Sequence, residues 1–279
     1  MNYCLRYTNI CKSLKEVQEI SIKYIEDRGL VDFMKKYSGK RIILQIDSLN
    51  FPGGEIRKLE AIRKTYPEYK FVVAMNTYKP ELMKVLRNAG IDYYLGAPCH
   101  SWEFLYQLTM VDKVNDIDLS GPLAFELPKV KAFLDKLDRK VNIRITPNLL
   151  VSEYEFTDKL VQFFIRPDDI NIYEPYIDIL EFAGIEHQDT FYNIYAKEKK
   201  FYGNLNQVIY NFSAAIDNKA LIPAFGERRL SCGRECLKGG RCRRCYNLTN
   251  IAEKMSPLIT EQIKKNIKKQ IKDKSSENK

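Results

Sequence analysis

The chain has 279 residues and a formal net charge of +9. Hydrophobic residues make up 45% of the sequence and aromatic residues 12%, which is too much apolar material for a disordered chain. No apolar run approaches the length of about eighteen residues that a membrane-spanning helix needs, so composition excludes both a disordered and a transmembrane protein.

The positive charge is concentrated at the C-terminal end. Residues 226–279 carry 15 Lys and Arg against 6 Asp and Glu, whereas the first 225 residues carry 30 of each kind. A basic tail therefore follows a neutral body, and contact with RNA or another nucleic acid is an expectation about the tail. No secretory leader opens the sequence, which predicts a cytoplasmic protein.

Eight short β-rich runs, most of them ending in polar, Gly or Pro residues, recur along the neutral body. They are Tyr3–Tyr7, Arg41–Ile46, Phe71–Met75, Ile91–Leu95, Ile117–Leu119, Val141–Ile145, Val161–Ile165 and Ile177–Phe182. Helical patterns lie between several of them, at residues 14–24 and at Pro80–Ala89, which Gly90 ends. This alternation predicts a (β/α)8 TIM-like parallel barrel. An open doubly wound sheet is the alternative if one strand is missed or false.

We predict three parts along the chain. Residues 1–225 form the barrel and a helical extension, residues 226–250 form a four-cysteine metal-binding element, and residues 251–279 form a basic amphipathic helix and tail. Around the start of the last part, Leu248–Met255 and Pro257–Ile271 carry apolar residues at helical spacing with lysines between them. Such a stripe docks on the parent domain or on a partner protein more often than on a membrane.

Polar residues follow many of the predicted strands. Because parallel strands end at the same edge of a sheet or barrel, these residues predict a pocket that binds a small molecule. Carboxylates and imidazole can transfer protons, and a guanidinium suits a carboxylate or a phosphate. The candidate catalytic residues are Asp47, His100, Arg166 and Glu181. The candidates for binding a ligand or cofactor are Asn76, Asn148 and Asp168.

The strongest local signal is a C-x3-C-x5-C-x2-C arrangement. Its members are Cys232, Cys236, Cys242 and Cys245. Four soft thiolates, with glycines between them that let the backbone wrap an ion, predict a metal centre. A compact four-cysteine element of this kind is usually a structural Zn²⁺ site, and the spacing alone does not distinguish it from an iron–sulfur cluster such as 4Fe-4S. The other three cysteines are predicted to be free thiols.

Two late stretches, Phe164–Ile170 and Tyr173–Gly184, resemble the late barrel strands of the collagenase-like peptidase family. The order of barrel and then cysteines is also similar. Several members of that family look like iron–sulfur proteins that hydroxylate RNA bases or a quinone precursor. The resemblance implies that Arg166, Asp168 and Glu181 lie at the barrel mouth and that the cysteine cluster holds iron and sulfur.

We therefore expect a cytoplasmic iron–sulfur barrel enzyme that modifies RNA or a small carboxylated metabolite, by a hydroxylation-type reaction. The alternative is a non-catalytic, zinc-stabilised protein for nucleic-acid binding or assembly. A peptidase is third, because the sequence contains no recognisable HExxH zinc motif or GxSxG nucleophile motif.

Overall fold

A computed structural model describes residues 1–8, 11–24, 27–149, 163–210, 212, 215–221, 225–230, 232 and 243–276. The described residues form one sheet of eight parallel strands. The strands are β1 (Asn2–Arg6), β2 (Glu19–Lys23), β3 (Arg41–Ile46), β4 (Lys70–Met75), β5 (Tyr93–Leu95), β6 (Asp116–Asp118), β7 (Asn142–Ile145) and β8 (Ile179–Glu181).

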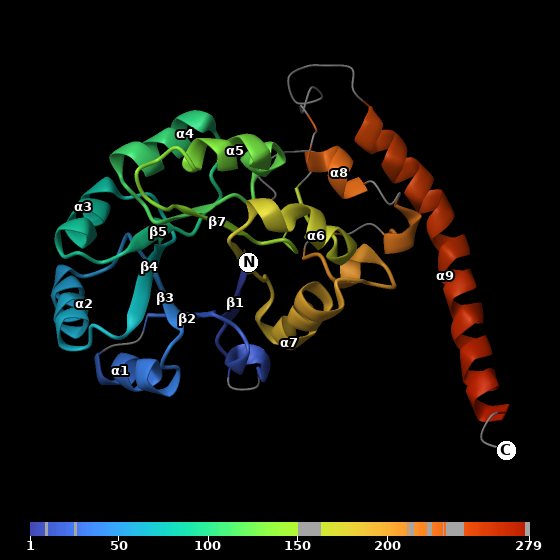
Figure 1. The fold of residues 1–279 in the computed structure, drawn as a ribbon, viewed down its shortest axis with the longest axis horizontal. Coiled ribbons are helices and arrows are strands. Elements are labelled where there is room, and N and C mark those ends of the chain that lie inside the picture. The colour runs from blue at the N-terminus through green and yellow to red at the C-terminus, as the bar shows by residue number, and fades with distance from the viewer. Residues whose placement is uncertain are drawn as a thin grey trace.

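The sheet curls into a nearly closed TIM-like barrel, which confirms the predicted fold class (Figure 1). The strand order is β5-β4-β3-β2-β1-β8-β7-β6. The strands at the two ends of this order, β5 and β6, approach each other. The backbone N–H of Asn115, just before β6, donates to the Tyr93 carbonyl of β5 at 3.4 Å.

Helices surround the strands and close the outer core. They are α1 (Asp27–Lys36), α2 (Gly53–Thr65), α3 (Pro80–Asn88), α4 (Trp102–Tyr106), α5 (Leu127–Leu134), α6 (Ile170–Tyr173), α7 (Gln188–Tyr192), α8 (Phe225–Leu230) and α9 (Arg244–Ser276). The helix predicted at Pro80–Ala89 is α3, and Gly90 ends it with a φ of 67°, a conformation that favours glycine.

Alternate residues of each strand point to opposite sides of the barrel wall. In β3, Ile42 and Leu44 belong to the large outer core that the helices cover, whereas Ile43 faces the barrel interior. The interior apolar cluster is small and consists of Cys4, Ile43, Val72, Ala74, Tyr94 and Ile179. Many of the remaining inward positions are polar or charged, and these residues form the candidate site.

The helix predicted from the pattern at residues 14–24 is wrong, because these residues include the strand β2. The sequence of this strand is Glu-Ile-Ser-Ile-Lys, and its first four residues are buried. Ile20 and Ile22 pack in the outer core, whereas Glu19 and Ser21 face the polar interior of the barrel. Both sides of the strand are therefore buried. Leu14 and Val17 precede the strand and also pack in the outer core, and together with Ile20 and Ile22 they have a spacing that resembles the spacing in a helix.

The strand predicted at Val161–Ile165 is wrong over its described part, Phe163–Ile165, which has no regular secondary structure. Residues 161 and 162 lie outside the described residues. Phe163 and Phe164 are buried and pack against other aromatic rings, such as those of Tyr173 and Phe225. The count of eight was thus right because one false strand replaced one missed strand.

The two helical segments predicted near the C-terminus form one helix, α9, which contains Pro257. Figure 1 shows α9 along one side of the molecule, with its C-terminal end away from the barrel. Its docked face includes Ser256, whose hydroxyl accepts from the Asp217 backbone N–H at 2.8 Å, and Thr260, which donates to the Asp217 carboxylate at 3.1 Å.

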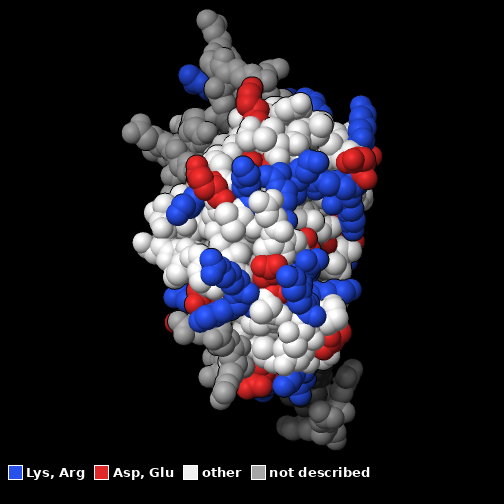
Figure 2. Space-filling model, turned by 90° about the vertical axis from the view of Figure 1, so that its left-hand side faces the viewer, with Lys and Arg blue, Asp and Glu red and all other residues white. Residues whose placement is uncertain are grey.

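The outer surface of the body carries charged side chains of both signs. On the face in Figure 2, acidic side chains are interspersed among lysines and arginines. On α2, for example, Lys58 pairs with Glu55 at 2.8 Å and Lys64 pairs with Glu60 at 2.7 Å.

Candidate functional site

A polar cavity of about 460 Å³ opens at the carboxyl ends of the strands. We call it the mouth cavity. Active sites of (β/α)8 barrels lie at this end of the strands. Its polar lining residues are Arg6, Gln45, Asn76, Asp118, Ser120, Arg144, Thr146 and Glu181. Ala74 and Tyr94 of the interior apolar cluster contribute to its apolar walls.

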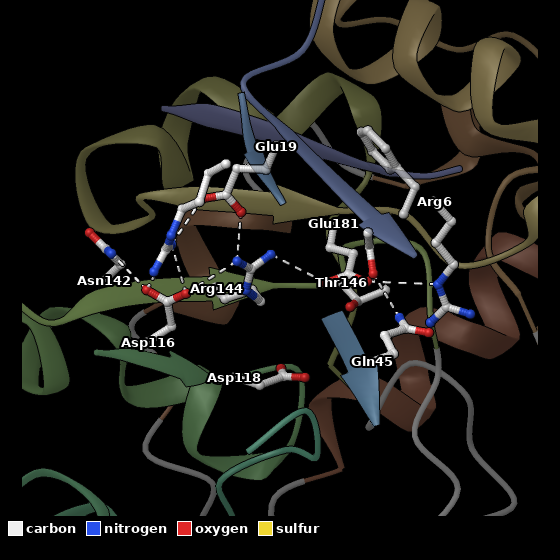
Figure 3. Close-up of polar contacts among 12 residues, drawn as sticks. Arg6, Glu19, Gln45, Asp116, Asp118, Asn142, Arg144, Thr146 and Glu181 are labelled. Atoms are coloured by element: carbon white, nitrogen blue, oxygen red, sulfur yellow. Dashed lines mark hydrogen bonds and ion pairs between the residues drawn. The ribbon is translucent and has the colours of Figure 1, made fainter. Parts of the chain in front are cut away.

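Arg144 of β7 is the central group below this cavity, and its side chain is 1% exposed. Its guanidinium pairs with Glu19 at 2.6 Å, with Asp116 at 3.2 Å and with Glu181 at 3.3 Å (Figure 3). It also lies over the ring of Tyr94, 4.8 Å from the centroid. Burial alone would disfavour the charged guanidinium, but the surrounding acidic groups outweigh it and raise the Arg144 pKa.

A second arginine completes the ion-pair network at the opposite end of the barrel. Arg41 pairs with Glu19 at 3.0 Å and with Asp116 at 2.9 Å. The Asn142 amide donates to Asp116 at 2.7 Å. Burial raises the Asp116 pKa, but the charges of Arg144 and Arg41 outweigh it and hold the pKa below its ordinary value. We call Glu19, Arg41, Asp116, Asn142 and Arg144 the charge plug.

Arg6 lies at the mouth, at the end of β1. Its Nε is 3.7 Å from the Glu181 carboxylate, and its side chain is 38% exposed. Among the described residues, this Nε has no hydrogen-bond partner although it is buried. The Arg6 side chain is thus partly exposed at the mouth, whereas the Arg144 guanidinium is buried and already contacts three carboxylates.

Asp118 differs from the other interior carboxylates because its carboxyl group has no arginine partner among the described residues. It accepts a hydrogen bond from the Ser120 backbone N–H at 2.8 Å. Burial raises the Asp118 pKa to about 6, and the negative charge of Glu181 acts in the same direction. A carboxyl group with this pKa is available in both protonation states near neutral pH.

The structure brings only two of the predicted site residues to the mouth cavity, Glu181 and Asn76. Asn76 is also tied to Ser48, whose backbone N–H and hydroxyl donate to the Asn76 side-chain oxygen at 3.0 and 2.7 Å. Asp47 is exposed in the turn after β3, where it accepts from the side-chain amide of Asn50 at 2.6 Å.

The other predicted residues lie in structural contacts away from this lining. Arg166 is buried and pairs with Asp169 through two hydrogen bonds of 2.6 and 2.8 Å. Asp168 accepts from the Asn218 amide at 2.5 Å and pairs with Lys219. Asn148 exchanges two hydrogen bonds with the Ala183 backbone, and His100 lies against Gly121.

Sequence reasoning missed Arg6, Gln45, Asp118 and Arg144. The available signal was the alternation in Asp-Ile-Asp of β6 and Asn-Ile-Arg-Ile of β7. There the isoleucines face the outer core, and the polar residues share the inward side.

The cysteine element is partly within the described structure. Cys232 and Cys245 are described and partly buried, whereas Cys236 and Cys242 lie outside the described residues. Considering the described residues alone, no group of three or more His, Cys, Asp or Glu is arranged to hold a metal. The predicted free thiols Cys4, Cys11 and Cys99 are free cysteines.

Arg229 of α8 is a buried cation near the two described cysteines. Its guanidinium is stacked 4.5 to 5.0 Å from the ring centroids of Phe125, Phe164 and Phe225. Burial lowers the Arg229 pKa, and nearby Tyr173 and the thiols of Cys245 and Cys232 oppose that effect. Both described cysteines therefore lie within electrostatic range of one buried cation.

The described part of α9 carries the exposed lysines Lys264, Lys265 and Lys268. Its nucleic-acid partner stays a prediction. Within the ranges that the structure covers, no helix has both the length and the apolar character to cross a membrane.

Comparison with known proteins gives no family. No protein-family model and no curated protein matches the sequence. Among solved structures, the chain matches a cube-shaped, highly porous protein cage designed by fusing symmetric oligomeric domains. The two chains are 8% identical, the match covers 98% of this chain and 85% of the other, and the TM-score is 0.42.

Replacing Arg144 by Met is expected to destabilise the protein by about 3–5 kcal/mol, because three interior carboxylates lose a buried partner. Urea unfolding at neutral pH measures this free energy. Lys64→Met, in the exposed pair with Glu60, is the control and is expected to cost less than about 0.5 kcal/mol. A cost for Arg144→Met as small as that of the control would contradict the role of the charge plug.

Replacing Asp118 by Asn is expected to stabilise the protein near neutral pH by up to about 3 kcal/mol. The native carboxyl has a pKa of about 6 against an ordinary value of 3.8, so the folded wild type holds an unfavourable charge above pH 6. As the pH falls from about 6 to about 4, the native wild type binds a proton before the unfolded chain does, and the advantage of the variant disappears. Urea unfolding across this range measures the difference, and a difference that does not change with pH would contradict the assignment.

Proposed function

We propose that this chain is an enzyme that acts on a small carboxylated metabolite in the mouth cavity, with Asp118 as the proton-transfer group. The observation that carries this proposal is a carboxyl with a pKa of about 6 that faces a cavity at the carboxyl ends of the barrel strands. The polar lining and the size of the cavity favour a small polar molecule over an apolar one.

The surrounding residues have complementary roles in this proposal. Arg6 binds the substrate carboxylate, because its side chain lines the cavity, is partly exposed there, and ends in a guanidinium fork that fits a carboxylate. Glu181 holds Arg6 in position through their 3.7 Å contact, and Arg144 holds Glu181. Asp118 accepts a proton from the bound molecule when it is ionised and returns one when it is protonated.

We also propose that Cys232, Cys236, Cys242 and Cys245 hold an iron–sulfur cluster, which would supply electron-transfer chemistry to an oxidoreductive, hydroxylation-type modification. Two observations support this ligand set. Cys232 and Cys245 lie near the same buried cation, Arg229, whose charge offsets that of thiolates. Moreover, α8, which ends two residues before Cys232, packs against the segment Pro122–Glu126, and this segment closely follows Asp118 in the chain.

Carboxylate binding tests the first proposal. In isothermal titration with acetate, succinate and citrate, at least one is expected to bind, and Arg6→Gln is expected to weaken that binding about tenfold or more. Binding of acetate, whose single carboxyl stays largely ionised between about pH 7 and 5, is also expected to strengthen below about pH 6, where Asp118 is neutral, and this gain is expected to disappear in Asp118→Asn.

Lys35→Gln, on the outer face of α1, is the matched control for the loss of one cation. Absence of binding by all three carboxylates, or equal binding by the wild type and Arg6→Gln, would overturn the proposed substrate class.

Metal analysis tests the second proposal. Protein purified without oxygen is expected to be brown and to contain about four iron atoms per chain, as a cluster held by four cysteines would give. Cys232→Ser is expected to lose most of the iron, whereas Cys11→Ser, at a cysteine remote in sequence from the element, is expected to retain it. A colourless protein with stoichiometric zinc would overturn the cluster and favour the zinc-stabilised alternative.

A further inference from the structure

A second cavity of about 350 Å³ lies beside the mouth cavity, between the ends of β1, β2 and β3 and helix α1. The two cavities share two lining residues, Arg6 and Gln45. The walls of the second cavity include the apolar side chains of Tyr7, Ile22 and Phe33. The polar mouth cavity thus adjoins a predominantly apolar space, and Arg6 lies at their junction.

The apolar wall is a packed aromatic cluster. The ring of Tyr7 meets that of Phe33 edge to face, with centroids 4.9 Å apart and an interplanar angle of 89°. Tyr37 contacts both rings, at 6.1 Å from Tyr7 and 4.8 Å from Phe33. Lys36 lies 5.3 Å from the Tyr37 ring centroid. These contacts fix the orientation of the wall, and a further aromatic ring can extend the same edge-to-face pattern.

Side-chain contacts hold the two residues at the junction, Gln45 and Arg6, in position. The Gln45 side-chain amide donates to the Ser21 hydroxyl at 2.8 Å, which holds Gln45 against β2. Arg6 is held by its contact with Glu181 on the mouth side. Lys23, at the end of β2, is exposed and adds a cation at the rim of the second cavity.

We propose that the second cavity is a subsite for an aromatic arm of the substrate, so that the substrate class is an aryl-substituted carboxylate. This inference rests on the proposed function: the carboxylate binds Arg6, the reacting end enters the mouth cavity, and the aromatic arm lies against Tyr7 and Phe33. The arm gains affinity by removing apolar surface from water and by ring contacts with the wall. An alkyl arm would gain only the first of these.

The test compares succinate with 2-benzylsuccinate, which has the same two carboxylates and adds a phenylmethyl arm. In isothermal titration, 2-benzylsuccinate is expected to bind the wild type about tenfold or more tightly than succinate. Phe33→Ala is expected to reduce this ratio to about threefold or less and to leave succinate affinity unchanged. Arg6→Gln is expected to weaken both ligands.

Phe33 is buried, so its truncation can destabilise the fold by several kcal/mol. Phe33→Trp is therefore the second variant: it enlarges the wall, narrows the subsite and is also expected to reduce the affinity ratio. Tyr202→Ala, at an exposed aromatic residue that lines neither cavity, is the control and is expected to keep the wild-type ratio.

The possible outcomes separate the two proposals. Succinate binding without an aromatic gain, or a gain that persists in both Phe33 variants, overturns the subsite and leaves the proposed function standing. If neither succinate nor 2-benzylsuccinate binds, the subsite is overturned. The proposed function fails as well if acetate and citrate also do not bind.

Discussion

The pairing of the buried Arg144 guanidinium with three carboxylates is the interaction on which the barrel interior depends. Many barrels fill this space with layers of branched aliphatic side chains. Here the interior apolar cluster is small, and acidic residues occupy β2, β6 and β8. Without Arg144 and Arg41, their charges would face one another in a space with little water. Burial of such charges is tolerated only when they are paired.

The same network explains why one carboxylate differs from the others. Glu19, Asp116 and Glu181 each contact an arginine, and these contacts engage both Arg144 and Arg41. Asp118 lies two residues beyond Asp116 on the same inward side, but it accepts a hydrogen bond from the Ser120 backbone N–H and pairs with no arginine among the described residues. Burial without an arginine partner thus raises the Asp118 pKa, and the negative charge of Glu181 adds to this effect. Arg6, by contrast with Arg144, is partly exposed at the mouth.

The sequence predicted the fold better than the site, for a definite physical reason. Apolar runs such as Arg41–Ile46 are visible because their outward residues form the main core, and parallel alternation follows from them. The site depends on polar residues that point into the barrel. The same runs contain these residues, but a pattern of apolar residues does not indicate them. Residues after the strand ends, such as Arg166, were expected at the mouth. The chain instead uses Arg166 to anchor Asp169 and the Asn218 carbonyl. Only tertiary contacts distinguish polar residues that line the cavity from those that make structural contacts elsewhere.

The charge plug also constrains the order in which the chain can mature during synthesis. Glu19 and Arg144 are separated by 125 positions, yet their side chains are 2.6 Å apart. While the first half of the chain emerges from the ribosome, Glu19 can pair with Arg41 alone. The ion pairs of Glu19 and Asp116 with Arg144 can form only once β7 is present. Closure is a late, long-range event, of the kind that slows folding because a long loop must be ordered first.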